Sequence, residues 1–139
     1  MPRKNYRFLL YSIIALFVAS GCSQTMRLRN SRDVPAAIGE AEFSKSDNNN
    51  TRVKINVDHL APPQNLSPAR TTYVVWAQAP TGQVQNLGQI KVGSDRKAEF
   101  TGSTALPVFR LMVTAEDRPD VTFPSPQIVF STDSYEARS

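Results

Sequence analysis

The stretch Thr51–Asp58 reads TRVKINVD, and its side chains alternate strictly between polar and apolar. In an extended chain Val53, Ile55 and Val57 point to one side, and the polar residues between them point to the other. This period of two is typical of a β-strand with one buried face and one solvated face. The stretch therefore points to a fold built of strands that bury one face each.

The segment before this stretch continues the β pattern. Ala37, Gly39, Ala41 and Phe43 occupy every second position, with larger or charged residues between them. Residues 47–50 (DNNN) then supply turn formers that tolerate the left-handed backbone conformation. The two alternating segments with the turn between them predict a β-hairpin.

The next apolar segment, residues 71–78 (TTYVVWAQ), is almost entirely β-branched or aromatic. Such a run predicts a central strand that is covered on both faces. We expect its Trp76 to lie in the core of the domain. In the following segment, residues 83–92, Gly88 predicts a β-bulge.

Short strands with turn residues between them recur about every ten residues along the chain. The expected strands are residues 36–43, 51–58, 71–78, 83–92, 97–101, 108–115 and 127–131. This spacing predicts an all-β fold, and we favour an immunoglobulin-like antiparallel β-sandwich of about seven strands. The sandwich domain is expected over 36–131, after a flexible tether at 22–35 and before a disordered tail at 132–139.

The first 21 residues have the pattern of an export signal. Arg3, Lys4 and Arg7 precede an apolar run at residues 8–19, which is too short to span a bilayer but fits the hydrophobic part of a signal peptide. Residues 19–22 (ASGC) resemble the lipobox of bacterial lipoproteins. The resemblance implies cleavage between Gly21 and Cys22 and lipid attachment to the Cys22 sulfur.

An ordinary signal peptide is the alternative, and it would leave Cys22 as a free thiol. Cys22 is the only cysteine, so no disulfide can form within the chain. Ser23 follows it, where lipoproteins retained in the inner membrane commonly carry Asp. We therefore expect an extracytoplasmic, lipid-anchored protein, in the outer membrane if the organism has one, with periplasm as its surroundings.

The net charge of +4 is mostly a property of the leader. Three of the 16 basic residues lie there, which leaves 13 basic residues against 12 acidic ones. The remaining excess lies at Arg27, Arg29 and Arg32, which would either rest on anionic lipid headgroups or belong to a solvated tether. The sequence has no basic stripe with interleaved aromatic residues, which is the pattern that would predict nucleic-acid binding.

A second resemblance involves the middle of the chain. Residues 72–77 (TYVVWA), 80–82 (PTG), 86–88 (NLG) and 113–116 (VTAE) occur in this order. They are similar to the extracytoplasmic domain of anti-sigma-K (RskA-type) factors over about residues 71–130. That resemblance implies a sandwich fold. It does not imply control of a sigma factor, because a lipoprotein signal replaces the sigma-binding region and membrane helix of that family.

The sequence offers no catalytic, metal or cofactor site that we would assign. His59 is the only histidine, and it is next to Asp58. Neighbours in a strand point to opposite faces, so this pair cannot form the hydrogen bond of a catalytic triad. Zinc would need more Cys and His ligands, and the spacing of residues 47–50 matches no calcium loop.

Three functions remain open at this point. The first is a non-enzymatic structural or interaction module that docks on an envelope protein by strand addition or surface contact. The second is a binding module for a glycan or small ligand, which exposed loop aromatics would favour. The third is an accessory of envelope-stress signalling, by the anti-sigma resemblance.

Overall fold

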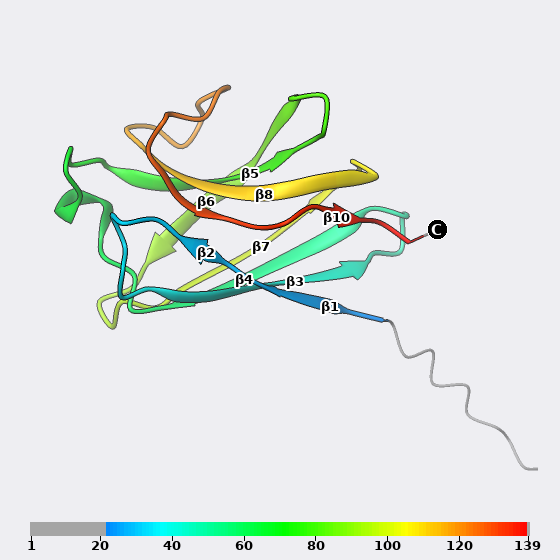
Figure 1. The fold of residues 1–139 in the computed structure, drawn as a ribbon, viewed down its shortest axis with the longest axis horizontal. Helices are drawn as coiled ribbons and strands as arrows, with labels where there is room; N and C mark the ends of the chain where they lie inside the picture. The colour runs from blue at the N-terminus through cyan, green and yellow to red at the C-terminus, as the bar shows by residue number, and fades with distance from the viewer. Residues whose placement is uncertain (1–21, 139) are drawn as a thin grey trace, which may run out of the picture.

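The computed structural model describes residues 22–138 and shows an all-β protein (Figure 1). The predicted signal peptide, including Gly21 of the cleavage site, lies outside the described residues. The strands are β1 (Gln24–Arg27), β2 (Arg29–Asn30), β3 (Ile38–Lys45), β4 (Thr51–Asp58), β5 (Thr72–Gln78), β6 (Val84–Val92), β7 (Ala98–Thr104), β8 (Val108–Glu116), β9 (Ile128–Ser131) and β10 (Tyr135–Glu136). A short 3₁₀ helix spans Pro63–Asn65.

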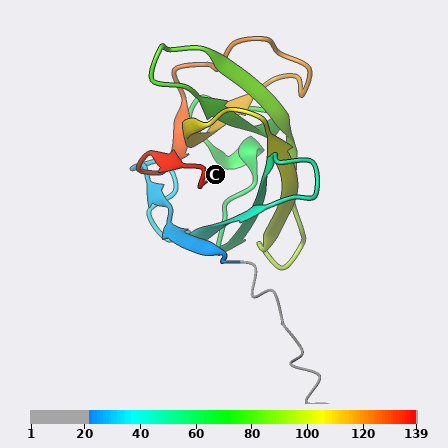
Figure 2. The ribbon, with the colours of Figure 1, turned by 90° about the vertical axis from the view of Figure 1, so that its right-hand side faces the viewer.

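The strands form two antiparallel layers that face each other across the core (Figure 2). One layer contains β1, β3, β4 and β7, and the other contains β6, β5, β8, β9 and β2. Strand β6 pairs with β5 along most of its length and with β7 at its end, so it joins the layers on one side. The all-β, sandwich-like fold class is confirmed, but with ten strands among the described residues instead of about seven.

The N-terminal segment joins the layers on the other side. Strand β1 pairs with β3 of the first layer, and one residue later β2 pairs with β9 of the second. The crossing residue, Leu28, is buried, and its amide donates to the Gly39 carbonyl at 2.9 Å. The sheet is therefore nearly closed on itself.

The two segments predicted as a tether and a disordered tail belong to the fold. Residues 22–35 contain β1 and β2, and residues 132–139 contain β10, which pairs with β8. The prediction was wrong because edge strands of this kind carry few apolar residues. Leu28 and Val34 are buried in the first segment and Tyr135 in the second.

The core between the layers is built from alternating side chains, as the sequence predicts. In β4 the residues Val53, Ile55 and Val57 are buried, and Arg52 and Lys54 are exposed. The turn after β3 has Asn49 at a φ of 64°, in the left-handed region. The expected hairpin of β3 and β4 is confirmed, with eight paired residues on each strand.

Strand β5 is central in its layer and covered on both faces, also as predicted. Tyr73, Val75 and Ala77 belong to the core between the layers. Trp76 does not: it is fully buried on the opposite face of the sheet, in an outer cluster with Val74 and Met112, against which Val84 and Val121 pack. Trp76 is buried, as expected, but on the outer face of the sheet and not between the layers, because an all-apolar strand does not reveal which face points inward.

The predicted bulge at Gly88 is confirmed. The register of β5 against β6 shifts between Val75, which is opposite Gly88, and Trp76, which is opposite Asn86. Gly88 has a φ of 138°, a conformation that side chains other than glycine rarely adopt. The bulge turns Asn86 toward the outer cluster, where its amide binds the loop described below.

Candidate functional site

Cys22 lies at one end of the molecule and is exposed, with a free thiol. Only Ser23 separates it from the first residue of β1. A lipid on this sulfur would therefore hold the domain directly against the membrane, because no length of linker lies between anchor and fold.

Two strands border an opening in the sheet beside Cys22, and we call this opening the seam. Among residues 22–138, β1 pairs only with β3, and β10 pairs only with β8. Residues of both strands line the same hollow, of about 530 Å³. From the place where β2 pairs with β9, β1 and β10 separate toward the Cys22 end (Figure 1). Each thus presents an edge whose backbone groups have no strand partner.

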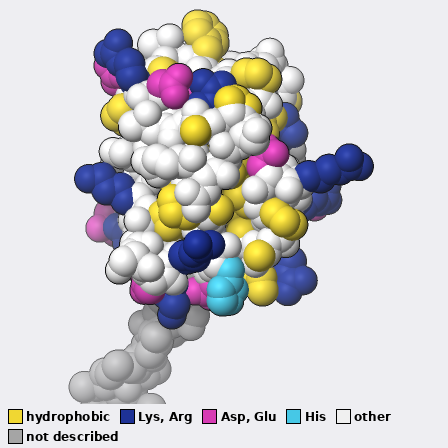
Figure 3. Space-filling view, turned by 90° about the vertical axis from the view of Figure 1, so that its left-hand side faces the viewer, with side chains coloured by type: hydrophobic (Ala, Val, Ile, Leu, Met, Phe, Trp, Pro, Cys, Tyr) yellow, Lys and Arg dark blue, Asp and Glu magenta, His cyan; other side chains and the backbone are white. Residues whose placement is uncertain are grey.

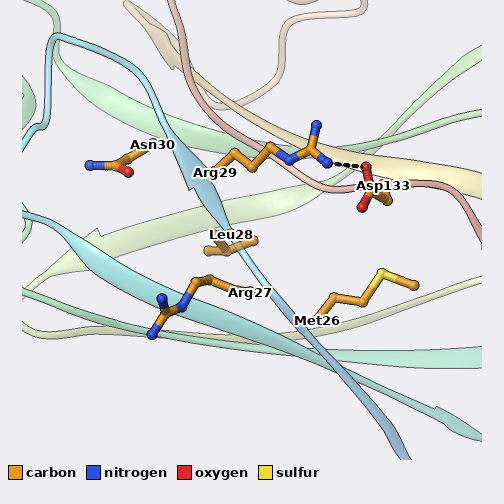
Figure 4. A pocket seen from close by; sticks show the side chains of 6 residues that line it. All are labelled: Met26, Arg27, Leu28, Arg29, Asn30 and Asp133. Carbon is orange, nitrogen blue, oxygen red and sulfur yellow. Dashed lines mark hydrogen bonds and ion pairs between the residues drawn. The ribbon is translucent and has the colours of Figure 1, made fainter.

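The narrow end of the seam is fastened by an ion pair. The Arg29 guanidinium donates to the Asp133 carboxylate at 2.6 Å, from β2 to the neighbouring chain just after β9 (Figure 4). Both side chains are about 70% exposed, so water weakens their attraction. The hollow here measures about 490 Å³ and is open to solvent.

The floor of the seam is partly apolar. Tyr135 of β10 stacks on Phe43 of β3, with ring centroids 4.4 Å apart, and Phe109 lies edge-on to Phe43 and tilted against Tyr135. Met26 of β1 is half-buried against the core and also borders the seam. An extended chain placed in the seam would meet these side chains on its inward face.

The loop at residues 117–127, between β8 and β9, lies at the other end of the molecule, and we call it the cap loop (Figure 1). It covers the outer cluster by placing Val121 against Trp76 and its neighbours. The Asn86 amide donates to the carbonyls of Pro119 and Val121, at 2.9 Å each. The loop is thereby bound to β6 as well as to β8.

A series of hydrogen bonds between polar groups of β5, β8 and the cap loop holds the loop against the sheet. The Trp76 indole donates to the Thr114 hydroxyl at 2.8 Å, and that hydroxyl donates to the Glu116 carboxylate at 2.7 Å. The same carboxylate oxygen accepts from the Ser125 amide at 2.6 Å. Every polar group in this series therefore has a partner, which is what allows it to be buried.

The cap loop also presents one large aromatic side chain to solvent. Phe123 is 76% exposed. Figure 3 shows this end of the molecule, where apolar side chains lie between charged ones that stand around the rim. An exposed aromatic on a fixed loop is a common element of binding surfaces.

Two titratable groups lie in perturbing surroundings. Burial, and secondly the charge of Asp33, raises the pKa of Tyr73, whose hydroxyl donates to the Ala61 carbonyl at 2.7 Å. Hydrogen bonding from Arg118 lowers the pKa of Asp120 on the exposed cap loop. Both shifts are explained by structural contacts.

The residues singled out from the sequence are scattered through the structure. Arg27 lies opposite Glu40 on β3, and Arg29 pairs with Asp133, so acidic residues accompany both. His59 is exposed just after β4, at a φ of 57°. Sequence reasoning missed Tyr135, Glu116 and Phe123. Of these three, only Phe123 has a usable signal in the sequence, because it is an aromatic residue within a polar, proline-containing stretch.

Within the described part of the chain, no helix is long and apolar enough to cross a membrane. No three His, Cys, Asp or Glu side chains among residues 22–138 gather where they could hold a metal ion. Comparison with family models, curated proteins and solved structures gave no match. Both resemblances drawn from the sequence therefore stay predictions.

Proposed function

We propose that this protein is a lipoprotein of the bacterial cell envelope that acts without catalysis, as an anchored module for binding a partner protein. The supporting observation is the position of Cys22, exposed and one residue before a strand whose outer edge is unpaired. Anchor and binding edge are thus placed side by side.

The anchor follows from the lipobox resemblance of residues 19–22. Lipid on Cys22 with two or more acyl chains gives stable membrane attachment, whereas one chain gives only reversible binding. The domain would stand on the extracytoplasmic face, on the outer membrane in an organism that has one. With Ser23 as the only spacer, the seam opens toward the lipid surface.

The binding edge follows from the backbone of the seam. Unpaired strand edges are templates for strand addition, in which a partner's extended segment supplies the missing hydrogen bonds. Here two such edges border one hollow, so a guest strand that adds to the four-residue edge of β1 would have the two-residue edge of β10 across the hollow. Met26 and Tyr135 would select apolar side chains on the guest's inward face.

In vivo photo-crosslinking tests this proposal. A photoreactive amino acid replaces Thr25, which is exposed on β1, and in a matched control it replaces Glu99, which is exposed on β7 and paired on both sides, with Asn56 and with Lys91. We expect one dominant envelope protein crosslinked from position 25 and absent from position 99. The Cys22→Ser variant should lose it. Equal patterns from both positions would contradict strand addition.

A second candidate, glycan or small-ligand binding, is favoured only by Phe123. Its exposed ring on the fixed cap loop is available for stacking on a sugar or another planar group. Titration of the protein with envelope polysaccharides would show a response that Phe123→Ala abolishes. A flat titration would remove this candidate.

A further inference from the structure

A third hollow, of about 680 Å³, lies directly beside Cys22 at the wide end of the seam. Its walls come from both layers: β1 and the end of β3 on one side, and β10 with the residues after it on the other. This volume lies within the range of about 300–1,000 Å³ that small-molecule sites occupy. We call it the basic hollow, for the side chains that border it.

The charges that border the basic hollow are all positive. Lys45 and Arg138 line it, from opposite layers, and no carboxylate side chain does. Neither cation is within ion-pair distance of an acidic side chain in the described part of the protein. The remaining lining supplies neutral donors, among them Gln24, Asn49 and Thr51. Two cations that lack an acidic partner among the described residues, together with neutral donors, form a surface complementary to an anion.

The position of these cations relative to Cys22 decides which anion they meet. Gln24 pairs with Phe43, so Cys22 and Lys45 leave the same end of the β1–β3 pair. An anchor on Cys22 would bring this end, and no other, to the headgroup layer of the membrane. The arginines of β1 and β2 are less suited, because Glu40 and Asp133 lie opposite them.

We infer that the basic hollow binds the phosphate headgroup of an anionic membrane phospholipid next to the protein's own anchor. This inference rests on the proposed function, because it requires Cys22 to carry lipid. Headgroup binding would fix the orientation of the domain, which a single attachment point leaves free to rotate. It would thereby set the direction in which the seam and the cap loop are presented.

Vesicle tethering through the sole cysteine tests the inference. The mature chain, residues 22–139, is coupled through the Cys22 thiol to a maleimide lipid in phosphatidylcholine vesicles, with or without phosphatidylglycerol. Coupling raises the effective concentration of headgroups at the hollow, so that weak binding becomes measurable. Amide hydrogen exchange of residues 45–51 and 135–138 reports contact with the surface.

We expect exchange in these segments to slow by about fivefold on phosphatidylglycerol vesicles, the effect of roughly one well-placed cation near an anionic surface. K45Q/R138Q should lose the slowing. K54Q/K91Q, which removes the same charge from exposed positions on β4 and β6, should keep it. No slowing in the unaltered protein, or equal slowing in K45Q/R138Q, would overturn the inference.

Mass spectrometry of the protein extracted from cell membranes separates this result from the proposed function. Absence of lipid on Cys22 would refute the anchor, whatever the vesicles show. Lipid on Cys22 together with unchanged exchange on phosphatidylglycerol would leave the anchor in place and refute the basic hollow alone.

Discussion

The cap loop and the seam finish the same sandwich in opposite ways. At the cap loop, side chains close the structure: Trp76 is fully buried, and Glu116 binds both a strand hydroxyl and a loop amide. At the seam, backbone edges are left without strand partners, and one exposed ion pair fastens the narrow end. The contrast teaches that a polar loop can be rigid, while a region made of strands can be the open one.

The strongest way to break this comparison is to remove the centre of the outer cluster. Trp76→Ala should lower the free energy of unfolding by about 3–5 kcal/mol, because it leaves a cavity and removes the indole that donates to the Thr114 hydroxyl. Chemical denaturation followed by circular dichroism measures this. Phe123→Ala on the same loop should change stability by less than about 0.5 kcal/mol. Similar losses in both variants would mean that the outer cluster is not a core.

The carboxylate under the cap loop gives the next largest effect. Glu116→Ala leaves the Thr114 hydroxyl and the Ser125 amide without their acceptor and should cost about 1–3 kcal/mol. Glu116→Gln keeps an acceptor oxygen and should cost less. Hydrogen exchange should speed up over residues 117–127 and stay unchanged in β1. Faster exchange in β1 as well would show that the two ends are coupled.

The loss of stability at alkaline pH tests the core between the layers, through the buried Tyr73. Because burial raises the pKa of Tyr73, the folded protein keeps this phenol neutral where the unfolded chain ionises, above a pH of about 10. The contribution of the neutral Tyr73 to the free energy of unfolding is therefore fully present below that pH and is lost as the pH rises further. Tyr73→Phe should cost about 1 kcal/mol at neutral pH, through the lost bond to Ala61, and should decline less above pH 10. Denaturation curves at a series of pH values measure both. If the stability of the unaltered protein and that of Tyr73→Phe fell equally above pH 10, groups other than Tyr73 would cause the alkaline loss.

The smallest effect is expected at the seam. Asp133→Asn removes an exposed ion pair and should cost about 0–1 kcal/mol. The local effect of Asp133→Asn should be larger. Amide hydrogen exchange should become faster in β1 and β10 and stay unchanged in the cap loop. Arg118→Gln, which removes an equally exposed pair with Asp120, is the matched control. A loss above about 2 kcal/mol would show that the seam, too, is closed by its side chains.

The sequence predicted the seven strands from β3 to β9 because each has a local signature. The alternation in Thr51–Asp58 and the turn at residues 47–50 depend only on neighbouring residues. Strands β1, β2 and β10 lack such a signature. They exist because distant strands pair with them, and Met26 and Leu28 are too few to show a period.

The candidate site was less predictable than the fold for the same reason. Cys22 stands out through the resemblance of residues 19–22, but the groups near it come from positions 45–51 and 134–138, far along the chain. The face of Trp76 depends on a loop that returns over the sheet some 40 residues later. Patterns among neighbouring residues therefore predict neither the surroundings of Cys22 nor the face on which Trp76 lies.

The absence of a spacer after Cys22 also has a mechanical consequence. A pull on a lipid at this residue would pass through Ser23 straight into β1 and along its axis. Under a load that breaks headgroup binding, the domain would turn about its single attachment point until the pull ran along the axis of β1. The hydrogen bonds of the β1–β3 ladder would then share the force in shear instead of opening one after another. Extraction of the anchor from a bilayer would thus strain the side of β1 that is paired with β3 and leave the seam unloaded.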